Sequence, residues 1–412
     1  MHDTPGGSSA IGIRPAVLHI VDPALAARVA APAYDSLSAA ERIRIAAGDP
    51  LSYLNVLQTP EDDGGDLRAA LRSNRRVLQR LLRDGVFHSA PGPRFAWYRL
   101  AVNGHEQTAL IAEVAIDDYE AGRIVRHEHT RADREEHLAV YLETVAASSS
   151  PVSLAYADDQ RLTSLTGHAT AADPVMAFTS ADGVEHTIWT TGDPAACTEI
   201  SAAAQGLSRL YITDGHHRLA AAARVAASGR AAGHGRDAPD QWVLAALFPA
   251  GDLRILPFHR AVLRPRDITT PELLSSLRER ADVRVLDGPA TPDRPHSFVT
   301  WVDGGWYELS VSPGDVAPGV LQALDVMVLQ DHVLGPVFGV LEPRFDPRLA
   351  YVPGGPAEVA AYCEERRAVG FVLRATSMDE LMAVADAELV MPPKSTRFDP
   401  KTRSGIFLRL SG

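Results

Sequence analysis

Apolar residues recur along the chain either at the spacing of a helix or at every second position, as in a strand. Stretches of the two kinds follow one another. Residues 66–84 carry apolar side chains at helical spacing and end at Gly85, so they predict a helix. Residues 38–47, which begin with a capping residue, predict another. Residues 95–102 and 108–116 alternate between apolar and polar positions and predict strands. The first part of the chain is therefore expected to mix helices with sheet.

The remaining pattern continues this mixture and predicts an α+β fold in three regions, residues 1–118, 119–262 and 263–412. Residues 242–248 and 253–258 predict a hairpin around residues 250–252. The other expected strands are residues 124–125, 152–156, 186–190, 211–212, 297–302, 306–311, 371–374 and 405–410, and the other expected helices are residues 22–29, 133–146, 270–281, 320–334 and 356–368.

Composition excludes several functional classes. The chain has 412 residues, 46% apolar and 22% charged, without a run of eighteen apolar residues, so a membrane span is not expected. The net charge of −12 argues against nucleic acid as a main partner. Residues 1–9 read as a disordered lead without a secretory signal, and Cys197 and Cys363 read as free thiols of a cytoplasmic protein. A homo-oligomer stays an open alternative.

The most informative stretch is Asp214-Gly215-His216-His217-Arg218, which follows an apolar strand and opens an alanine-rich helix. The N-terminus of a helix has unpaired N–H groups and the positive end of the helix dipole, so it suits an anion. Gly215 allows a ligand to come close to the backbone. The guanidinium of Arg218 can bind a phosphate or a carboxylate with two hydrogen bonds. The pattern favours a phosphate-binding or catalytic turn over a polar helix cap with solvated histidines.

A second polar group, Arg126-His127-Glu128-His129-Thr130, follows the short strand at residues 124–125. Glu128 is a candidate general base if a pocket raises its pKa. His127 and His129 share a face if the strand continues, which also fits a weak metal pair. The alternative is a solvated set of charges. We expect the substrate to contact Arg126, His127 and His129.

A third group, Pro392-Pro393-Lys394-Ser395-Thr396, lies near the C-terminus and is followed by Phe398 and Lys401. The two prolines stiffen the segment, and Lys394, Ser395 and Thr396 are candidates to reach a phosphate. A terminal arm with its lysines in water is an equal alternative. The P-loop, dinucleotide-binding, protein-kinase, HExxH and GxSxG signatures are absent from the sequence.

Five spaced motifs resemble a bacterial family of unknown function, DUF1015, over nearly the whole chain. The motifs are Ile13-Arg14-Pro15, residues 31–35 (APAYD), the His127–Glu128 group, Thr213 to Arg218, and Pro392 to Thr396. The middle region also resembles the ParB/sulfiredoxin-like free serine kinases, through His127-Glu128, Glu136-His137-Leu138, Pro151-Val152 and the DGHHR sequence. The resemblance implies a ParB/sulfiredoxin-like core framed by N- and C-terminal α+β regions.

The kinase resemblance also implies roles for individual residues. Glu128 would draw the proton from a substrate hydroxyl, His216, His217 and Arg218 would hold nucleotide phosphates, and Asp214 would lie near the metal. We therefore expect a small-molecule kinase that uses ATP or ADP with Mg²⁺ and acts on the hydroxyl of serine or a serine-like metabolite.

Two other functions stay open at this point. The first is a non-enzymatic, ParB-like nucleotide-binding regulator, although the net acidity argues against a DNA-linked version of it. The second and weaker one is a metal-dependent hydrolase that uses His127, His129, His216 and His217.

Overall fold

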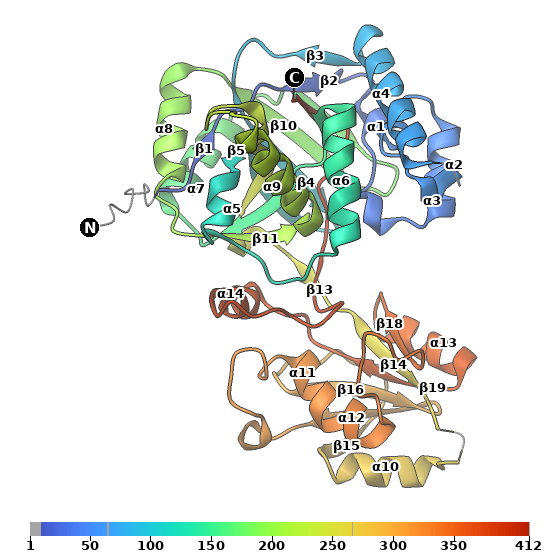
Figure 1. Cartoon of the computed structure of the whole chain (residues 1–412). Coiled ribbons are helices and arrows are strands. Elements are labelled where there is room, and N and C mark those ends of the chain that lie inside the picture. The colour runs from blue at the N-terminus through green and yellow to red at the C-terminus, as the bar shows by residue number, and fades with distance from the viewer. Residues whose placement is uncertain (1–9, 64–65, 266, 412) are drawn as a thin grey trace. The chain divides into compact units, whose positions relative to one another are not determined.

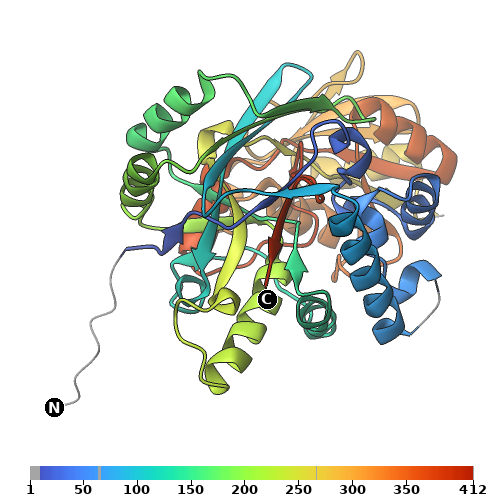
Figure 2. The ribbon, with the colours of Figure 1, turned by 90° about the horizontal axis from the view of Figure 1, so that it is seen from above.

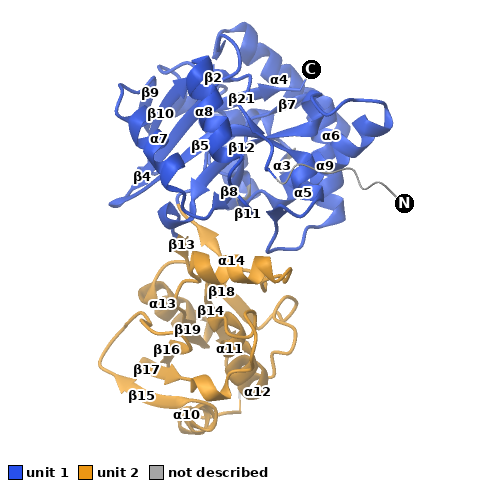
Figure 3. Ribbon diagram, turned by 90° about the vertical axis from the view of Figure 1, so that its left-hand side faces the viewer, with its two compact units in different colours: residues 1–254, 400–412 blue, residues 255–399 orange. Residues whose placement is uncertain are grey.

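The computed structural model describes residues 10–63, 66–265 and 267–411, so the lead expected at residues 1–9 lies outside the described residues. The chain forms two compact units (Figure 3). Unit 1 contains residues 1–254 and 400–412, and unit 2 contains residues 255–399. The chain therefore leaves unit 1 after Arg254 and returns to it at Pro400.

A nine-stranded sheet forms the centre of unit 1. Its order is β6-β11-β8-β12-β5-β4-β10-β9, and β1 pairs with β5 beside this path. The pairs β6–β11 and β8–β12 are parallel, and the other pairs are antiparallel. The strands are β1 (Ile13–Arg14), β4 (Phe95–Val102), β5 (His105–Ala115), β6 (Ile124–Val125), β8 (Val152–Tyr156), β9 (Met176–Thr179), β10 (Glu185–Thr191), β11 (Leu210–Asp214) and β12 (Trp242–Pro249).

Both faces of this sheet are covered, because alternate side chains of a strand point to opposite faces. On β4, Ala96, Tyr98 and Leu100 join one apolar core, whereas Phe95 and Trp97 join another. Helices α1, α2 and α4 contribute to the first core, and α5, α7, α8 and α9 to the second. The helices of unit 1 are α1 (Ala26–Val29), α2 (Ala39–Gly48), α3 (Pro60–Asp63), α4 (Leu67–Arg83), α5 (Ile116–Glu120), α6 (Ala132–Val145), α7 (Gln160–Thr170), α8 (Pro194–Ala204) and α9 (His216–Ala231). Helices α6 and α9 pack side by side (Figure 1).

A smaller sheet within unit 1 pairs β2, from the early part of the chain, with β21, from its late part. Its order is β3-β2-β21-β7, with strands β2 (His19–Val21), β3 (Phe87–Ser89), β7 (Ala147–Ser148) and β21 (Phe407–Leu410). Figure 2 shows the dark red C-terminal strand β21 among the blue and green elements of this unit. Strand β21 is thus an integral part of unit 1.

Unit 2 is built on a six-stranded sheet of order β15-β17-β16-β19-β14-β18, and β13 pairs separately with β20. Helix α13 packs on β19 over Gly370, where an added Cβ would lie 2.3 Å from Val359 and 2.9 Å from Cys363. The strands are β13 (Ile255–Leu256), β14 (His259–Leu263), β15 (Asp282–Leu286), β16 (Ser297–Val302), β17 (Gly305–Ser310), β18 (Leu349–Val352), β19 (Ala368–Val372) and β20 (Arg397–Phe398). The helices are α10 (Thr270–Arg278), α11 (Asp325–Leu329), α12 (Gly335–Phe338), α13 (Pro356–Arg366) and α14 (Met378–Asp386).

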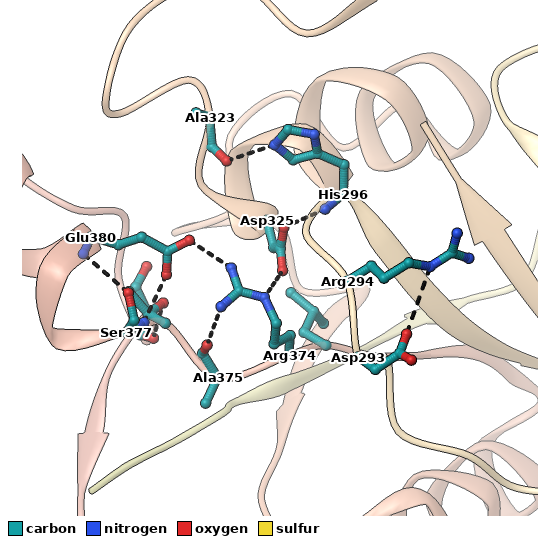
Figure 4. A network of polar contacts seen from close by, with 12 residues as sticks. Asp293, Arg294, His296, Ala323, Asp325, Arg374, Ala375, Ser377 and Glu380 are labelled. Atoms are coloured by element: carbon teal, nitrogen blue, oxygen red, sulfur yellow. Dashed lines mark hydrogen bonds and ion pairs between the residues drawn. The ribbon is translucent and has the colours of Figure 1, made fainter. Parts of the chain in front are cut away.

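A polar network fixes α11 and α14 within unit 2 (Figure 4). Asp325 accepts hydrogen bonds from the backbone N–H of His296 at 2.7 Å and from Nε of Arg374 at 3.2 Å. Arg374 also donates to Glu380 at 2.6 Å. Asp325 is 5% exposed, and burial raises the pKa of its carboxyl above the ordinary value. The network joins the loop before β16, the segment that follows β19 and the two helices α11 and α14.

Replacing Asp325 by Ala should lower the free energy of unfolding by about 2 kcal/mol, because a buried N–H and the Arg374 guanidinium lose their acceptor. Urea denaturation of the full chain measures the loss. Asp315, which is exposed in the same unit, provides the matched control Asp315→Ala, for which we expect little change. Equal stability of the two variants would contradict the assigned role of Asp325.

The mixed α+β class expected from the sequence is confirmed, as are the helices at residues 38–47 and 66–84 and the strand–turn–helix around Gly215. The hairpin expected from residues 242–248 and 253–258 is wrong. Strand β12 pairs with β5 and β8, whereas β13 pairs with β20 in the other unit. Both segments are apolar and flank a turn, but each one pairs with a strand that is distant in the sequence. The three expected regions also differ from the two units, because strands from residues 1–118 and 119–262 share one sheet.

Candidate functional site

A glycine in the left-handed region forms the turn between β11 and α9. Gly215 is the N-cap residue of α9 and has a φ of 95°, a conformation that favours glycine. A Cβ at this position would lie 3.0 Å from the guanidinium of Arg218. Because glycine has no side chain, no side chain caps the first N–H groups of α9 from this position. The helix is 16 residues long, so its N-terminus carries the positive end of a full helix dipole.

Asp214, the last residue of β11, lies between two cations. Its Oδ1 accepts a hydrogen bond from Nζ of Lys401 at 2.7 Å, and its Oδ2 is ion-paired with Arg218. Burial alone would raise the pKa of Asp214, but the charges of Arg218 and Lys401 outweigh it and hold the pKa below its ordinary value. Asp214 is thus the shared partner of two cations, Arg218 and Lys401.

Arg218 does not reach outward from the turn as the sequence suggested. Its Nη1 donates to the backbone carbonyls of Ser150 and Pro151, at 2.9 and 2.6 Å. Its Nη2 donates to Asp214. These contacts tie the first turn of α9 to the segment that enters β8. Arg218 therefore positions the turn, and the predicted direct contact with phosphate stays a prediction.

Glu128, the candidate base, lies at the same turn. Its Oε2 is 3.8 Å from Nδ1 of His216, and its side chain is 60% exposed. His216 is 5% exposed, and its ring meets the ring of His127 edge to face, with centroids 4.7 Å apart. The structure thus brings His216 beside His127 and Glu128, which lie almost 90 positions earlier in the sequence. Nε2 of His216 is buried and has no hydrogen-bond partner among the residues that the structure describes.

Both buried imidazoles are neutral near pH 7. Burial lowers the pKa of His127 from 6.5 to about 4, although a hydrogen bond to the backbone of Ile212 opposes the shift. Burial, followed by the neighbouring His127, lowers the pKa of His216 well below 6.5. A neutral imidazole has one N–H donor and one acceptor nitrogen, so either ring can hold a polar ligand without adding charge.

The shifted pKa of His127 predicts a loss of stability in acid. Between pH 6.5 and about 4 the unfolded chain binds a proton at this residue that the folded chain does not, so the free energy of unfolding falls as the pH falls. A shift from 6.5 to about 4 corresponds to a loss of at most about 3 kcal/mol.

Urea denaturation at several pH values between 7 and 4 tests this effect. The variant His127→Gln, which cannot titrate, should depend less on pH than the natural chain over this window. Parallel pH profiles of the two proteins would contradict the neutral, buried state of His127.

His217 faces helix α6. Its Nε2 accepts a hydrogen bond from the backbone N–H of Arg131, the N-cap residue of α6, at 3.0 Å. Burial, and then the charge of Arg134, lower the pKa of His217. Because Nε2 already accepts this hydrogen bond from the N-terminus of α6, His217 holds α6 against α9. Its predicted contact with phosphate stays a prediction.

The structure does not bring the remaining candidates of the first two motifs into the same group. Arg126 and His129 are exposed on the loop that carries Glu128, and their assignment to the substrate stays a prediction. Among residues 10–63, 66–265 and 267–411, no three His, Cys, Asp or Glu side chains lie close enough to hold a metal ion. Both oxygens of Asp214 contact cations, so the turn as folded does not fit the Mg²⁺ that was expected beside Asp214.

The third motif lies in unit 2. The hydroxyl of Ser395 donates to the carbonyl of Pro392 at 2.7 Å and is buried, which argues for a local structural role. Lys394 is exposed and has a φ of 58°, the left-handed region. Thr396 is half-buried, and its predicted contact with phosphate also stays a prediction.

The sequence analysis named Lys401 only as a residue that follows the third motif, but in the structure it contacts Asp214 at the turn. The segment around it is fixed on both sides, because the carbonyl of Pro400 accepts from Gln107 at 2.9 Å and the N–H of Gly405 donates to Ser149 at 2.7 Å. Arg403 is ion-paired with Asp182. One signal was available in the sequence. Lysine occurs only at positions 394 and 401, in a chain with 40 lysines and arginines together. An ammonium is a compact point charge that a guanidinium does not replace.

No curated protein matches the chain in sequence. Solved structures that resemble it include SbnI with a C-terminal truncation from Staphylococcus aureus, at 13% identity and a TM-score of 0.37, covering 72% of this chain and 85% of that one. Another is free serine kinase in complex with AMP, at 14% identity and a TM-score of 0.34, covering 72% and 91%. As the sequence resemblance predicts, a serine kinase is among them, but at these scores we take no activity from either structure.

None of the helices in the described part of the chain is long and apolar enough to cross a membrane. The family model described as "Protein of unknown function (DUF1015)" matches residues 13–327, about three quarters of the 412 residues. The chain therefore belongs to the DUF1015 family.

Proposed function

We propose that this protein is a nucleotide-dependent kinase that phosphorylates the hydroxyl of serine or of a serine-like metabolite. The observation that carries the proposal is the position of Glu128. Its carboxylate lies 3.8 Å from His216, at the glycine-led N-terminus of α9. A candidate proton acceptor and a candidate phosphate site therefore occupy one place, as phosphoryl transfer requires.

The phosphate site consists of the first N–H groups of α9 and the cation Lys401. Backbone N–H groups at a helix N-terminus bind phosphate oxygens, and Gly215 allows the phosphate to approach the backbone closely. The ammonium of Lys401, which contacts Asp214 beside this helix N-terminus, can form a charge-assisted hydrogen bond with a phosphate oxygen. The buried Nε2 of His216 is the kind of atom that a ligand or a water molecule satisfies.

In the proposed reaction, the substrate oxygen forms a new bond to the terminal phosphorus of the nucleotide while the bond from phosphorus to the leaving oxygen breaks. The hydroxyl proton passes to Glu128. Exposure of the Glu128 side chain leaves the carboxylate accessible to a small hydroxyl substrate. A bound Mg²⁺ would neutralise phosphate charge, but Asp214 does not fit as its ligand, so no step is assigned to the metal.

The proposal is tested by incubating the full chain with ATP or ADP and, in turn, with serine, homoserine and threonine. Phosphorus NMR detects the phosphomonoester that forms, and we expect one of the three to be phosphorylated. A chain that binds nucleotide but phosphorylates none of them would favour the nucleotide-binding regulator. A chain that binds no nucleotide would contradict both functions.

A further inference from the structure

Within the described residues of unit 2, three cations form a cluster without a carboxylate partner. Lys394 and Arg397 lie at the ring of Phe258, and Arg260 contacts the backbone carbonyls of Phe258 and Lys394. Nζ of Lys394 lies 5.1 Å from the centre of this ring, and Cζ of Arg397 lies 5.8 Å from it. Arg260, on β14, donates to the carbonyls of Phe258 and Lys394, at 2.5 and 3.2 Å. Residues from the beginning and the end of unit 2 thus place three positive charges together.

Arg260 is the most informative member of this cluster because it is only 5% exposed. Burial lowers the pKa of Arg260 to about 10, so the guanidinium stays charged near pH 7. Its partners are two carbonyl oxygens and the face of Tyr351, 5.2 Å away. Buried charges in proteins are normally paired with an opposite charge. Within the described residues, no carboxylate pairs with Arg260.

The other two cations are also without acid partners in the part of the chain that the structure describes. Nε of Arg397 is buried and has no hydrogen-bond partner there. The carboxylate of Glu358 influences His259, which neighbours Arg260 in sequence, and it accepts a hydrogen bond from the N–H of Gly355 at 2.8 Å. Burial lowers the pKa of His259 to about 4, so it adds no charge near pH 7. The cluster therefore carries three positive charges, and none of the described residues provides a counter-ion for it.

We propose that this cluster is a binding site for a phosphate group, carried by inorganic phosphate or by a phosphate monoester. A phosphate dianion offsets more of the three charges than a carboxylate does, and its oxygens can accept from a guanidinium and an ammonium together. The site lies entirely within unit 2, so it does not depend on the proposed function of the turn at Gly215. It also gives a reason for a lysine at position 394, one of only two in the chain.

Titration calorimetry of the full chain in chloride buffer, with inorganic phosphate and with O-phosphoserine as probes, tests this site. The variants Arg397→Gln and Lys394→Gln should each weaken binding of the probe roughly 10- to 100-fold, the scale of a hydrogen bond to a charged group. Arg280→Gln, at an exposed arginine of the same unit, is the matched control and should bind like the natural chain. The stronger of the two probes identifies the source of the phosphate.

Thermal unfolding provides a second readout, since a ligand that binds the folded state raises the Tm. Phosphate should raise the Tm of the natural chain and of Arg280→Gln more than that of either site variant. If Arg397→Gln does not fold, Lys394→Gln, at an exposed position, still decides the question. The proposal is overturned if the natural chain binds neither probe at millimolar concentration, or if binding survives both site variants and is lost in Lys401→Gln. Loss of binding in Lys401→Gln alone would mean that the phosphate binds at the Gly215 turn in unit 1.

Discussion

Replacing Glu128 by Gln should slow phosphorylation of the hydroxyl substrate by about 10²- to 10⁴-fold, the usual contribution of a general base. Glutamine keeps the size and most of the hydrogen bonding of glutamate but cannot accept a proton. The side chain is 60% exposed and lies beside His216 rather than in the core, so the variant should fold normally. Nucleotide affinity should stay nearly unchanged, because the phosphates are assigned to the backbone N–H groups of α9 and to Lys401 and not to Glu128.

The matched control for this experiment is Glu136→Gln, at an exposed glutamate on α6. It removes the same charge from the same region without touching the turn. We expect turnover close to that of the natural chain. A Glu128→Gln variant that is as fast as the control would remove Glu128 from the mechanism, whereas an equal loss in both variants would point to a general effect of charge.

Replacing Arg218 by Ala should lower the free energy of unfolding by about 3–5 kcal/mol, because it breaks a largely buried ion pair and removes two bonds to carbonyl oxygens. Asp214 would keep Lys401 as its only cation, and the carbonyls of Ser150 and Pro151 would lose their donor. Nucleotide binding should fall as well, since the turn would no longer be held in place.

Arg224→Ala is the control for Arg218→Ala, because Arg224 lies on the same helix, is 48% exposed and has a longer ion-pair contact of 3.6 Å. Its effect should be well under 1 kcal/mol, as is usual for exposed ion pairs. Chemical denaturation of both variants decides between two roles of Arg218. A stable Arg218→Ala protein that has lost only nucleotide binding would restore Arg218 as a direct phosphate ligand.

The sequence predicts the local part of this site correctly. A short apolar strand, a glycine and an alanine-rich helix are adjacent in the chain, so the turn from Asp214 to Arg218 follows from neighbouring residues alone. Strands β6 and β11 are parallel, so their C-terminal ends lie side by side. Glu128 follows β6 and His216 follows β11, which explains why the two residues lie close together.

The partners of those side chains could not be predicted, because they come from distant parts of the chain. Lys401 contacts Asp214 across 187 residues, and this contact changes Asp214 from a candidate metal ligand into the centre of an ion-pair cluster. Arg218 is directed to carbonyls 67 and 68 residues away. Periodicity and capping rules describe local structure and contain no information about such contacts. The mistaken hairpin at residues 242–258 has the same origin.

The central claim is that nucleotide phosphates bind at the N-terminus of α9, and a crystal structure of the full chain grown with ADP tests it most directly. The account predicts a phosphate oxygen about 3 Å from a backbone N–H in the first turn of α9, beside Lys401 and His216. Phosphates bound at another place, or crystals that contain no nucleotide at millimolar ADP, would contradict it.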